Sequence, residues 1–231
     1  MMINKIYNTL YKKYGPQGWW PLLAHKGINP TKTGSVTGYH PGDYSFPHTP
    51  EQKFEICCGA ILTQNTSWPQ VEKALQNLRR INSLSVKGIK KLSDGKLKEM
   101  IKPAGYYNQK ADYLRKFIVF FEKLDGTPTR NELLAVKGVG EETADSILLY
   151  AFKQTEFVVD AYTRRVFSRI GLTQKDAKYG EIKEFFETGL DKDVELFQEY
   201  HALLVELAKQ HCMTKPVCEG CPIRSMCKRS I

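Results

Sequence analysis

The sequence predicts an all-α protein made of two helical lobes, and three observations support this fold class. Apolar side chains recur at helical spacing through most of the 231 residues. Glycine, proline and helix-capping residues stand where these periodic segments begin and end. The short apolar run 157–159 is typical of a strand, but three residues are too few to make a sheet.

The first half of the chain is expected to hold helices on either side of a long loop. Residues 3–14 have the pattern of an amphipathic helix, which Gly15 and Pro16 end. The segment from there to residue 50 is rich in glycine, proline and threonine, and loops of this length are uncommon unless they are functional. Further helices are expected at 51–62, 68–81 and 107–124, with short solvated helices within 82–102.

In the second half, helical periodicity returns five times before a cysteine-rich tail. These helices are expected at 129–136, 141–152, 161–170, 181–187 and 193–210. We expect a six-helix lobe over residues 49–159 that includes a hairpin at 134–144. A second lobe is expected to combine residues 1–48 with residues 160–231 and to carry a metal-binding loop at 212–227.

The charge balance favours a polyanionic partner. The chain has 34 lysines and arginines against 25 aspartates and glutamates, which gives a formal net charge of +9. Such an excess suits nucleic acid or an anionic membrane surface. The sequence has neither a secretory signal nor an apolar stretch of the roughly 18 residues that a membrane span needs. We therefore expect a cytoplasmic monomer that does not associate with membranes.

The six cysteines fall into two groups. Cys57 and Cys58 are adjacent within an apolar run and are interpreted as buried core thiols. The other four lie within sixteen residues near the C-terminus, a spacing that indicates one metal site rather than disulfides. They are Cys212, Cys218, Cys221 and Cys227.

Residues 134–144 have the form helix, glycine-hydrophobic-glycine, helix. Gly138, Val139 and Gly140 make the turn, and Lys137 precedes it. Glycines allow a phosphate to approach the backbone closely, and the amides at the start of the second helix point at that anion. Such a hairpin can hold a DNA backbone independently of base sequence. A tight structural corner between two helices has the same pattern.

About twenty residues after the first hairpin glycine, Asp160 directly precedes a predicted helix in the run FVVDAYTRRV. Taken alone, an aspartate in this position is an N-cap. Together with the hairpin, the run GYYNQKA at 105–111 and the cysteine loop, it resembles the endonuclease III family of helix-hairpin-helix (HhH-GPD) DNA glycosylases. The resemblance covers most of residues 55–227.

The resemblance implies that Asp160 is the catalytic aspartate of a base-excision-repair enzyme. Departure of a base leaves an oxocarbenium-like sugar, which a nearby carboxylate stabilises while it orients or deprotonates a water molecule. The implied partner is double-stranded DNA that contains damaged bases, which would place the protein at the nucleoid.

Glu142 stands where members of the family that also cleave the DNA strand carry a lysine. That lysine attacks the sugar and forms a Schiff base, which a carboxylate cannot do. We therefore predict a monofunctional glycosylase with Glu142 as a second catalytic-site residue. Lys137 is interpreted as a phosphate contact.

Three segments resemble the branch of small 3-methyladenine DNA glycosylases within this family: WWP at 19–21, LTQNT at 62–66 and PAGYYNQKA at 103–111. By this resemblance Trp19, Trp20, Pro21 and Trp68 line the base pocket. Gln64 fills the gap that the flipped base leaves in the stack. A cationic alkylated base stacks well on electron-rich rings and would be favoured by the charge of Glu142. The alternative for these tryptophans is core packing.

The cysteine spacing C-x5-C-x2-C-x5-C is close to the C-x6-C-x2-C-x5-C pattern of the family's [4Fe–4S] cluster, with a first gap one residue shorter. We predict this cluster, in a structural role, with one zinc ion as the alternative. Basic residues around the loop favour a phosphate-binding surface: Lys209, Lys215, Arg224, Lys228 and Arg229.

The sequence is also compatible with other functions. The same fold could serve an endonuclease III-like glycosylase and AP lyase that uses another amine, or a glycosylase for mismatched uracil or thymine. From another class, the chain could be a non-catalytic DNA-binding protein or a redox sensor that uses its cluster. The aspartate in its motif position argues against the last two.

Overall fold

A computed structural model describes residues 1–228, and the predicted all-α class is confirmed for this range. Residues 157–159 are extended but pair with no other segment, and one isolated bridge joins Ile28 to Thr37. No helix within the described residues has the length and apolar character to cross a membrane. The α-helices are α1 Met2–Tyr14, α2 Pro50–Leu62, α3 Trp68–Arg80, α4 Val86–Lys91, α5 Asp94–Ile101, α6 Tyr107–Glu122, α7 Arg130–Leu134, α8 Glu141–Ser146, α9 Ala161–Ile170, α10 Tyr179–Gly189 and α11 Val194–Gln210.

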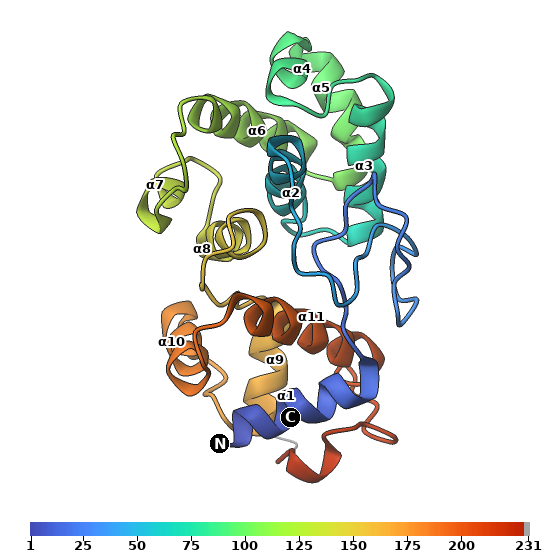
Figure 1. Cartoon of the computed structure of the whole chain (residues 1–231), viewed down its shortest axis with the longest axis vertical. Helices are drawn as coiled ribbons and strands as arrows, with labels where there is room; N and C mark the ends of the chain where they lie inside the picture. The colour runs from blue at the N-terminus through green and yellow to red at the C-terminus, as the bar shows by residue number, and fades with distance from the viewer. Residues whose placement is uncertain (229–231) are drawn as a thin grey trace.

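The helices form two groups that are separated along the long axis of the molecule. Figure 1 shows α2 to α8 in the upper group and α1 with α9, α10 and α11 in the lower one. The chain passes between the groups through the irregular segment 15–49 and through the non-helical segment 153–160. Lobe limits at 48–49 and 159–160 stay a prediction.

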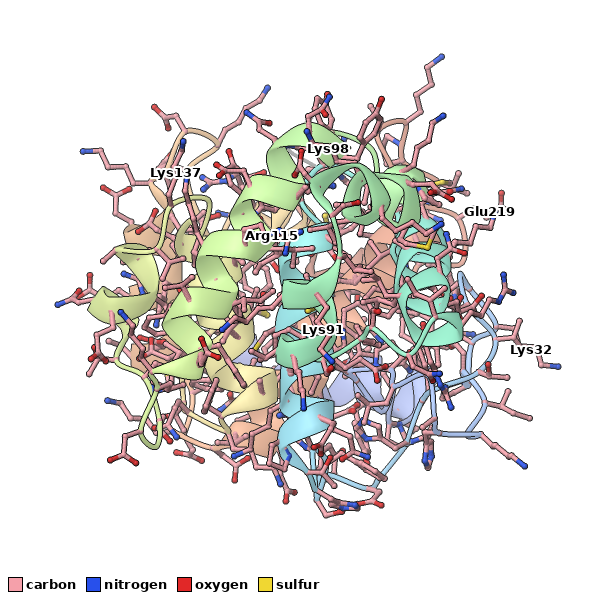
Figure 2. The ribbon with its side chains drawn as sticks, turned by 90° about the horizontal axis from the view of Figure 1, so that it is seen from above. Lys32, Lys91, Lys98, Arg115, Lys137 and Glu219 are labelled. Atoms are coloured by element: carbon pink, nitrogen blue, oxygen red, sulfur yellow. The ribbon has the colours of Figure 1, made fainter. Side chains whose placement is uncertain are left out.

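The upper group contains one helix more than predicted. Residues 49–159 form seven α-helices instead of six, because Ser85 and Ser93 each cap the start of a separate short helix. Arg115 on α6 donates to the carbonyl oxygens of Ile89 and Leu92 and so fixes the end of α4. Figure 2 looks down on this face, where Arg115 reaches the ribbon beside Lys91.

The two α-helices of the predicted hairpin are shorter than the predicted ranges 129–136 and 141–152. The first is limited to Arg130–Leu134, with Thr129 as its N-cap in a capping box with Glu132. The second, α8, continues into a π-helical turn over Ile147–Ala151. That turn packs against both α2 and α11, so it joins the two groups of helices. Local widening of a helix into a π turn is frequently found at functional sites.

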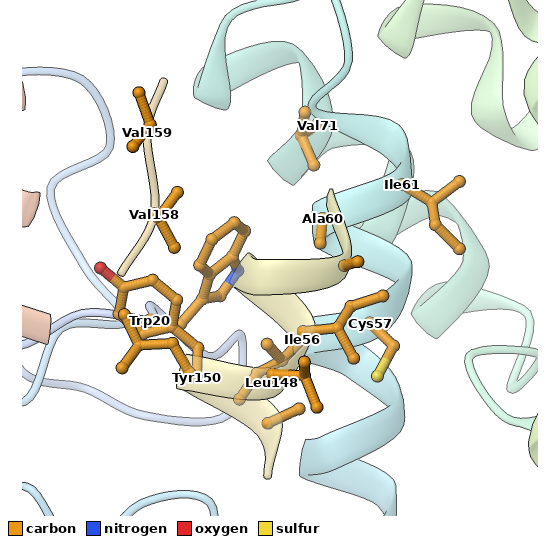
Figure 3. Close-up of a cluster of buried hydrophobic side chains, with 14 of the residues drawn as sticks. Trp20, Ile56, Cys57, Ala60, Ile61, Val71, Leu148, Tyr150, Val158 and Val159 are labelled. Carbon is orange, nitrogen blue, oxygen red and sulfur yellow. The ribbon is translucent and has the colours of Figure 1, made fainter. Parts of the chain in front are cut away.

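The core between the groups is apolar, and it includes the adjacent cysteines. Cys57 and Cys58 are fully buried and form no disulfide, which confirms them as core thiols. Burial raises the pKa of the Cys57 thiol well above its ordinary value. Figure 3 shows Trp20 and Tyr150 on the side of α2 that carries Ala60, with Cys57 on the other side of the helix.

Lys110 is a buried cation that holds the C-terminal end of α2. The side chain is 2 % exposed, and its Nζ donates to the carbonyl oxygen of Leu62 at 2.9 Å and to that of Ala104 at 2.7 Å. Burial lowers its pKa to about 8. The lysine thus satisfies helix-end carbonyls directly before the segment that carries Gln64.

Substitution Lys110→Met should lower the free energy of unfolding by about 3 kcal/mol, because two buried carbonyl groups lose their donor. Urea-induced unfolding followed by circular dichroism measures this change. The control is Lys116→Met, which removes an exposed ion pair with Asp112 on the same helix and should cost less than about 1 kcal/mol. Equal losses in the two variants would contradict the capping role of Lys110.

Candidate active site

Asp160 is the N-cap of α9, and the cap uses one of its two carboxylate oxygens. Oδ1 accepts from the backbone amide of Thr163 at 2.7 Å. Oδ2 instead faces His201 on α11, with 3.5 Å between Oδ2 and Nε2. The Asp160 side chain is 13 % exposed and that of His201 is 5 % exposed. The carboxylate is therefore both a capping group and a charge held beside a buried imidazole.

His201 and Tyr150 are site residues that the sequence analysis missed. The Tyr150 hydroxyl lies 2.7 Å from His201 Nδ1, and it donates to the carbonyl oxygen of Gln198 at 3.2 Å. Tyr150 comes from the π turn, so this contact joins the two groups of helices. Buried polar side chains within the otherwise apolar helix α11 were the signal that could have identified His201.

The surroundings of Asp160 favour its ionised form. Burial raises the pKa of this carboxyl, but the neighbouring His201 and the amide of Thr163 lower it by more, so that the net pKa lies below its ordinary value. A carboxylate in this state can stabilise positive charge that develops on a neighbouring group.

Glu142, in the first turn of α8, lies within electrostatic reach of Asp160. The residue is open to solvent on one side, while the protein around its inner side raises its pKa to about 7. The negative charge of Asp160 adds to this rise, and His201 opposes it. The two acidic residues predicted at the site therefore have pKa values displaced in opposite directions.

The predicted pocket aromatics form one continuous cluster next to this carboxylate pair. The ring of Trp19 lies 5.6 Å from that of His201, and the ring of Trp20 lies 5.2 Å from that of Tyr150. Trp20 also meets Trp68 edge to face at 5.3 Å. The indole nitrogens of Trp20 and Trp68 are buried without a hydrogen-bond partner. These rings are therefore packed in the core, and each of the two indole N–H groups is buried there without an acceptor.

A cavity of about 120 Å³ lies between the irregular segment and α3. Pro21 and Trp68, both predicted pocket residues, line it together with the polar side chains of Glu72, Gln76 and Arg79. Trp19 and Asp160 do not line this cavity. The predicted pocket residues thus divide between this cavity and the vicinity of His201.

The hairpin turn is packed from below by an aromatic ring. Gly138 has φ 93°, and a Cβ at this position would lie 2.2 Å from the ring of Tyr113, so no larger residue fits. Gln64 donates to the carbonyl oxygen of Gly138 at 2.8 Å and to Thr143 Oγ1 at 3.1 Å. In this structure Gln64 therefore holds the hairpin. Lys137 is 69 % exposed and lies 3.6 Å from Asp112.

A second chain of contacts links the hairpin to the backbone next to Asp160. Asp145 on α8 is fully buried and accepts from Arg130 Nε at 2.7 Å and from the Tyr179 hydroxyl at 2.8 Å. The Tyr179 oxygen in turn accepts from the amide of Val159 at 3.3 Å. Because Tyr179 belongs to α10, the chain spans both groups of helices and fixes the residue before the N-cap.

The four C-terminal cysteines line the wall of one small cavity of about 30 Å³, together with apolar side chains such as Ile170 and Leu207. A single zinc ion would draw the sulfur atoms to about 2.3 Å from one point. Among residues 1–228, no three metal-binding side chains converge in this way. Four thiols that line one cavity are the kind of donor set that a thiolate-bound metal group requires.

Two arginines of α9 fix the loop that carries these cysteines. Arg165 Nε donates to the carbonyl oxygen of Cys212 at 2.7 Å, and Arg169 donates to those of Met213 and Thr214 at 2.6 and 2.9 Å. The helix capped by Asp160 therefore also carries the cysteine loop. Arg229, one of the basic residues predicted around the loop, lies outside the described residues.

Comparison with known proteins decides the family. Residues 58–192 match the family model of the HhH-GPD superfamily of base excision DNA repair proteins. A Methanocaldococcus jannaschii protein described as a DNA repair glycosylase is 45% identical over 98% of this chain and 96% of its own length. The chain belongs to the HhH-GPD superfamily.

Within the superfamily, the resemblance to endonuclease III is also confirmed. Endonuclease III of Sulfolobus acidocaldarius is 31% identical over 76% of this HhH-GPD chain and 81% of its own. A solved structure of Helicobacter pylori 3-methyladenine DNA glycosylase, bound to 1,N6-ethenoadenine, superposes with a TM-score of 0.66. That protein is 28% identical, and the match covers 90% of this chain and 97% of the other. This HhH-GPD protein is thus a DNA repair glycosylase of the endonuclease III family.

Removal of the Asp160 charge should lower the pKa of Glu142, because a neighbouring negative charge disfavours ionisation. In Asp160→Asn the Glu142 carboxyl should therefore titrate at a lower pH than its value of about 7 in the wild type. Carbon-13 NMR of the side-chain carboxyl groups follows this titration, with Glu142→Gln to assign the resonance. An unchanged titration midpoint would show that the two carboxyl groups are not coupled.

Proposed function

We propose that this HhH-GPD protein is a monofunctional glycosylase that removes cationic alkylated bases such as 3-methyladenine from double-stranded DNA. The observation that supports it most strongly is the placement of an ionised Asp160 beside the cluster of Trp19, Trp20 and Tyr150, with Glu142 rather than an amine on the hairpin helix. The similarity to the H. pylori 3-methyladenine glycosylase favours the same substrate class.

In this proposal the flipped base stacks on the aromatic cluster. An alkylated purine that carries positive charge is attracted to electron-rich indole faces and to the two acidic residues. Its glycosidic bond breaks with both electrons going to the base, which leaves as a neutral molecule. The positive charge passes to the sugar, where the Asp160 carboxylate stabilises it. Water then adds to C1′ and gives its proton to Asp160, to Glu142 or to solvent.

We propose further that the hairpin from Lys137 to Gly140 binds a DNA phosphate, and that Gln64 leaves it to enter the gap beneath the flipped base. The four cysteines would hold a [4Fe–4S] cluster, which would fix the loop at 212–227 and its lysines against the DNA backbone. The cluster would supply rigidity rather than chemistry to base release. We expect the protein to act as a monomer at the nucleoid.

Asp160→Asn should reduce the single-turnover rate of 3-methyladenine release from methylated duplex DNA by at least about 100-fold, because the amide cannot stabilise the sugar cation or accept a proton. Chromatography of the released bases measures the rate. The control is Asp112→Asn, an exposed carboxylate near the hairpin that should leave the rate unchanged. Release by Asp160→Asn at the wild-type rate would contradict the proposed role.

Treatment of the same reactions with borohydride tests the monofunctional part of the proposal. We expect no covalent protein–DNA adduct, since Glu142 cannot form an imine. The amine to examine if an adduct appears is Lys209, whose Nζ lies 5.9 Å from the centre of the Trp19 ring and whose pKa is lowered by burial. An adduct that Lys209→Gln abolishes would replace the monofunctional assignment with a lyase.

A further inference from the structure

The segment from Gln17 to Leu23 carries three of the proposed pocket residues but belongs to no helix or strand. A segment of this kind has few backbone partners of its own, so other groups have to satisfy its amides and carbonyls. Three buried side chains meet this need. They come from different parts of the fold, and none of them was identified from the sequence: Glu199, Glu55 and His40.

Glu199 holds the start of the segment. Its Oε2 accepts from the amide of Gln17 at 2.8 Å, and its Oε1 accepts from the amides of Gln17 at 3.0 Å and Gly18 at 3.2 Å. Glu199 is 1 % exposed and lies on α11, two residues before His201. The same helix therefore sets the position of the segment and that of the histidine beside Asp160.

Glu55 and His40 hold the rest of the segment. Glu55 on α2 accepts from the amide of Leu23 at 2.6 Å through Oε1. His40 places Nε2 3.0 Å from the carbonyl oxygen of Trp20 and Nδ1 2.7 Å from that of Asp43. Glu199 on α11 and Glu55 on α2 accept hydrogen bonds from the two ends of the segment. Because α2 and α11 belong to different groups of helices, each group holds one end of it.

The electrostatic setting of Glu199 shows that this contact is costly. Among residues 1–228 it forms no ion pair, and phenol groups of Tyr7, Tyr44 and Tyr150 face it from α1, the irregular segment and the π turn. Burial raises the pKa of Glu199 to about 7, and the amides of Gln17 and Gly18 oppose that rise. Burial of a carboxylate costs free energy, and here only backbone amides offset that cost. We therefore attribute the presence of Glu199 to the position that it gives the segment rather than to a gain in stability.

We propose that Glu199 and Glu55 are positioning residues for the base pocket, which hold Trp19 and Trp20 in the arrangement that receives the flipped base. This inference rests on the proposed function. The carboxylates do not touch the base; they fix the backbone on either side of the two indoles. Loss of either contact should weaken capture of the base, while the chemistry at Asp160 continues once the base is bound.

Glu199→Gln tests the proposal with little change in shape. The amide NH2 group replaces Oε2 and sets a donor against the Gln17 N–H, so the 2.8 Å hydrogen bond and the negative charge are lost. Oε1 alone then accepts from the amides of Gln17 and Gly18, which weakens this anchor of the segment. We expect KM for methylated duplex DNA to rise about tenfold, while the single-turnover rate at saturating DNA changes by less than about twofold. The matched control is Glu195→Gln, an exposed glutamate on the same helix, which should behave as wild type.

Tryptophan fluorescence gives a readout that does not depend on the substrate. The three tryptophans of the chain are Trp19, Trp20 and Trp68, so intrinsic emission reports on the pocket cluster alone. Acrylamide quenching should increase in Glu199→Gln and not in Glu195→Gln. If wild-type protein releases no 3-methyladenine but quenching still rises, the proposed substrate is wrong and the positioning role stands.

Two results would overturn the positioning role: unchanged quenching in folded Glu199→Gln, or a fall in the saturated single-turnover rate with unchanged KM. If Glu199→Gln does not fold, Glu55→Gln provides the same test from the other end of the segment. Its control is Glu51→Gln, an exposed residue on the same helix. Normal quenching and normal KM in folded Glu55→Gln would likewise reject the proposal.

Discussion

The buried carboxylate of Asp160 sets the requirement on which the rest of the structure depends. An isolated charge in this position would be strongly destabilising, so the fold supplies it with partners from several directions. The amide of Thr163 serves one oxygen and His201 faces the other. Tyr179 holds the amide of Val159, directly before it. These partners lie on three helices of the lower group, and the upper group reaches two of them: Tyr150 contacts His201, and Asp145 accepts from Tyr179.

The same requirement explains why the molecule is not simply two independent bundles. The π turn at 147–151 extends the hairpin helix so that Tyr150 reaches His201 across the junction. Asp145, on the same helix, reaches Tyr179 in the lower group. A DNA phosphate bound at the hairpin would thus be rigidly connected to the acidic residue that acts on the sugar. In an enzyme that acts on a base flipped out of a duplex, a small displacement of the acidic residue relative to the bound DNA would change the rate strongly.

Recognition of the base places a different demand on the structure. In the proposed function, the indoles must be held in place without a regular element around them, since they would line a space that a planar ring can enter. The amides of Gln17 and Leu23, on either side of the indoles, donate to Glu199 and Glu55. One carboxylate comes from each helical group. The lower group therefore contributes both Asp160 and the anchor of Trp19.

Much of this architecture could be predicted from the sequence, because it follows from local patterns. The helical periods located α1, α3, α9 and α11 to within a residue or two, and the cysteine spacing placed four thiols around one cavity. The contacts of Gln17 with Glu199 and of Tyr150 with His201 join residues 182 and 51 positions apart, so no local pattern contains them. The π turn was missed for a related reason: it depends on packing between α2 and α11 rather than on composition.

In the proposed function, an ionised carboxylate and an aromatic cluster select a base that already carries positive charge. The most direct test compares single-turnover release from two duplexes of identical sequence, one with cationic 7-methylguanine or 3-methyladenine and the other with neutral uracil at the same position. We predict rapid release of the cationic base and negligible release of uracil. Release of uracil at an equal or greater rate would contradict the account and assign the site to deaminated bases.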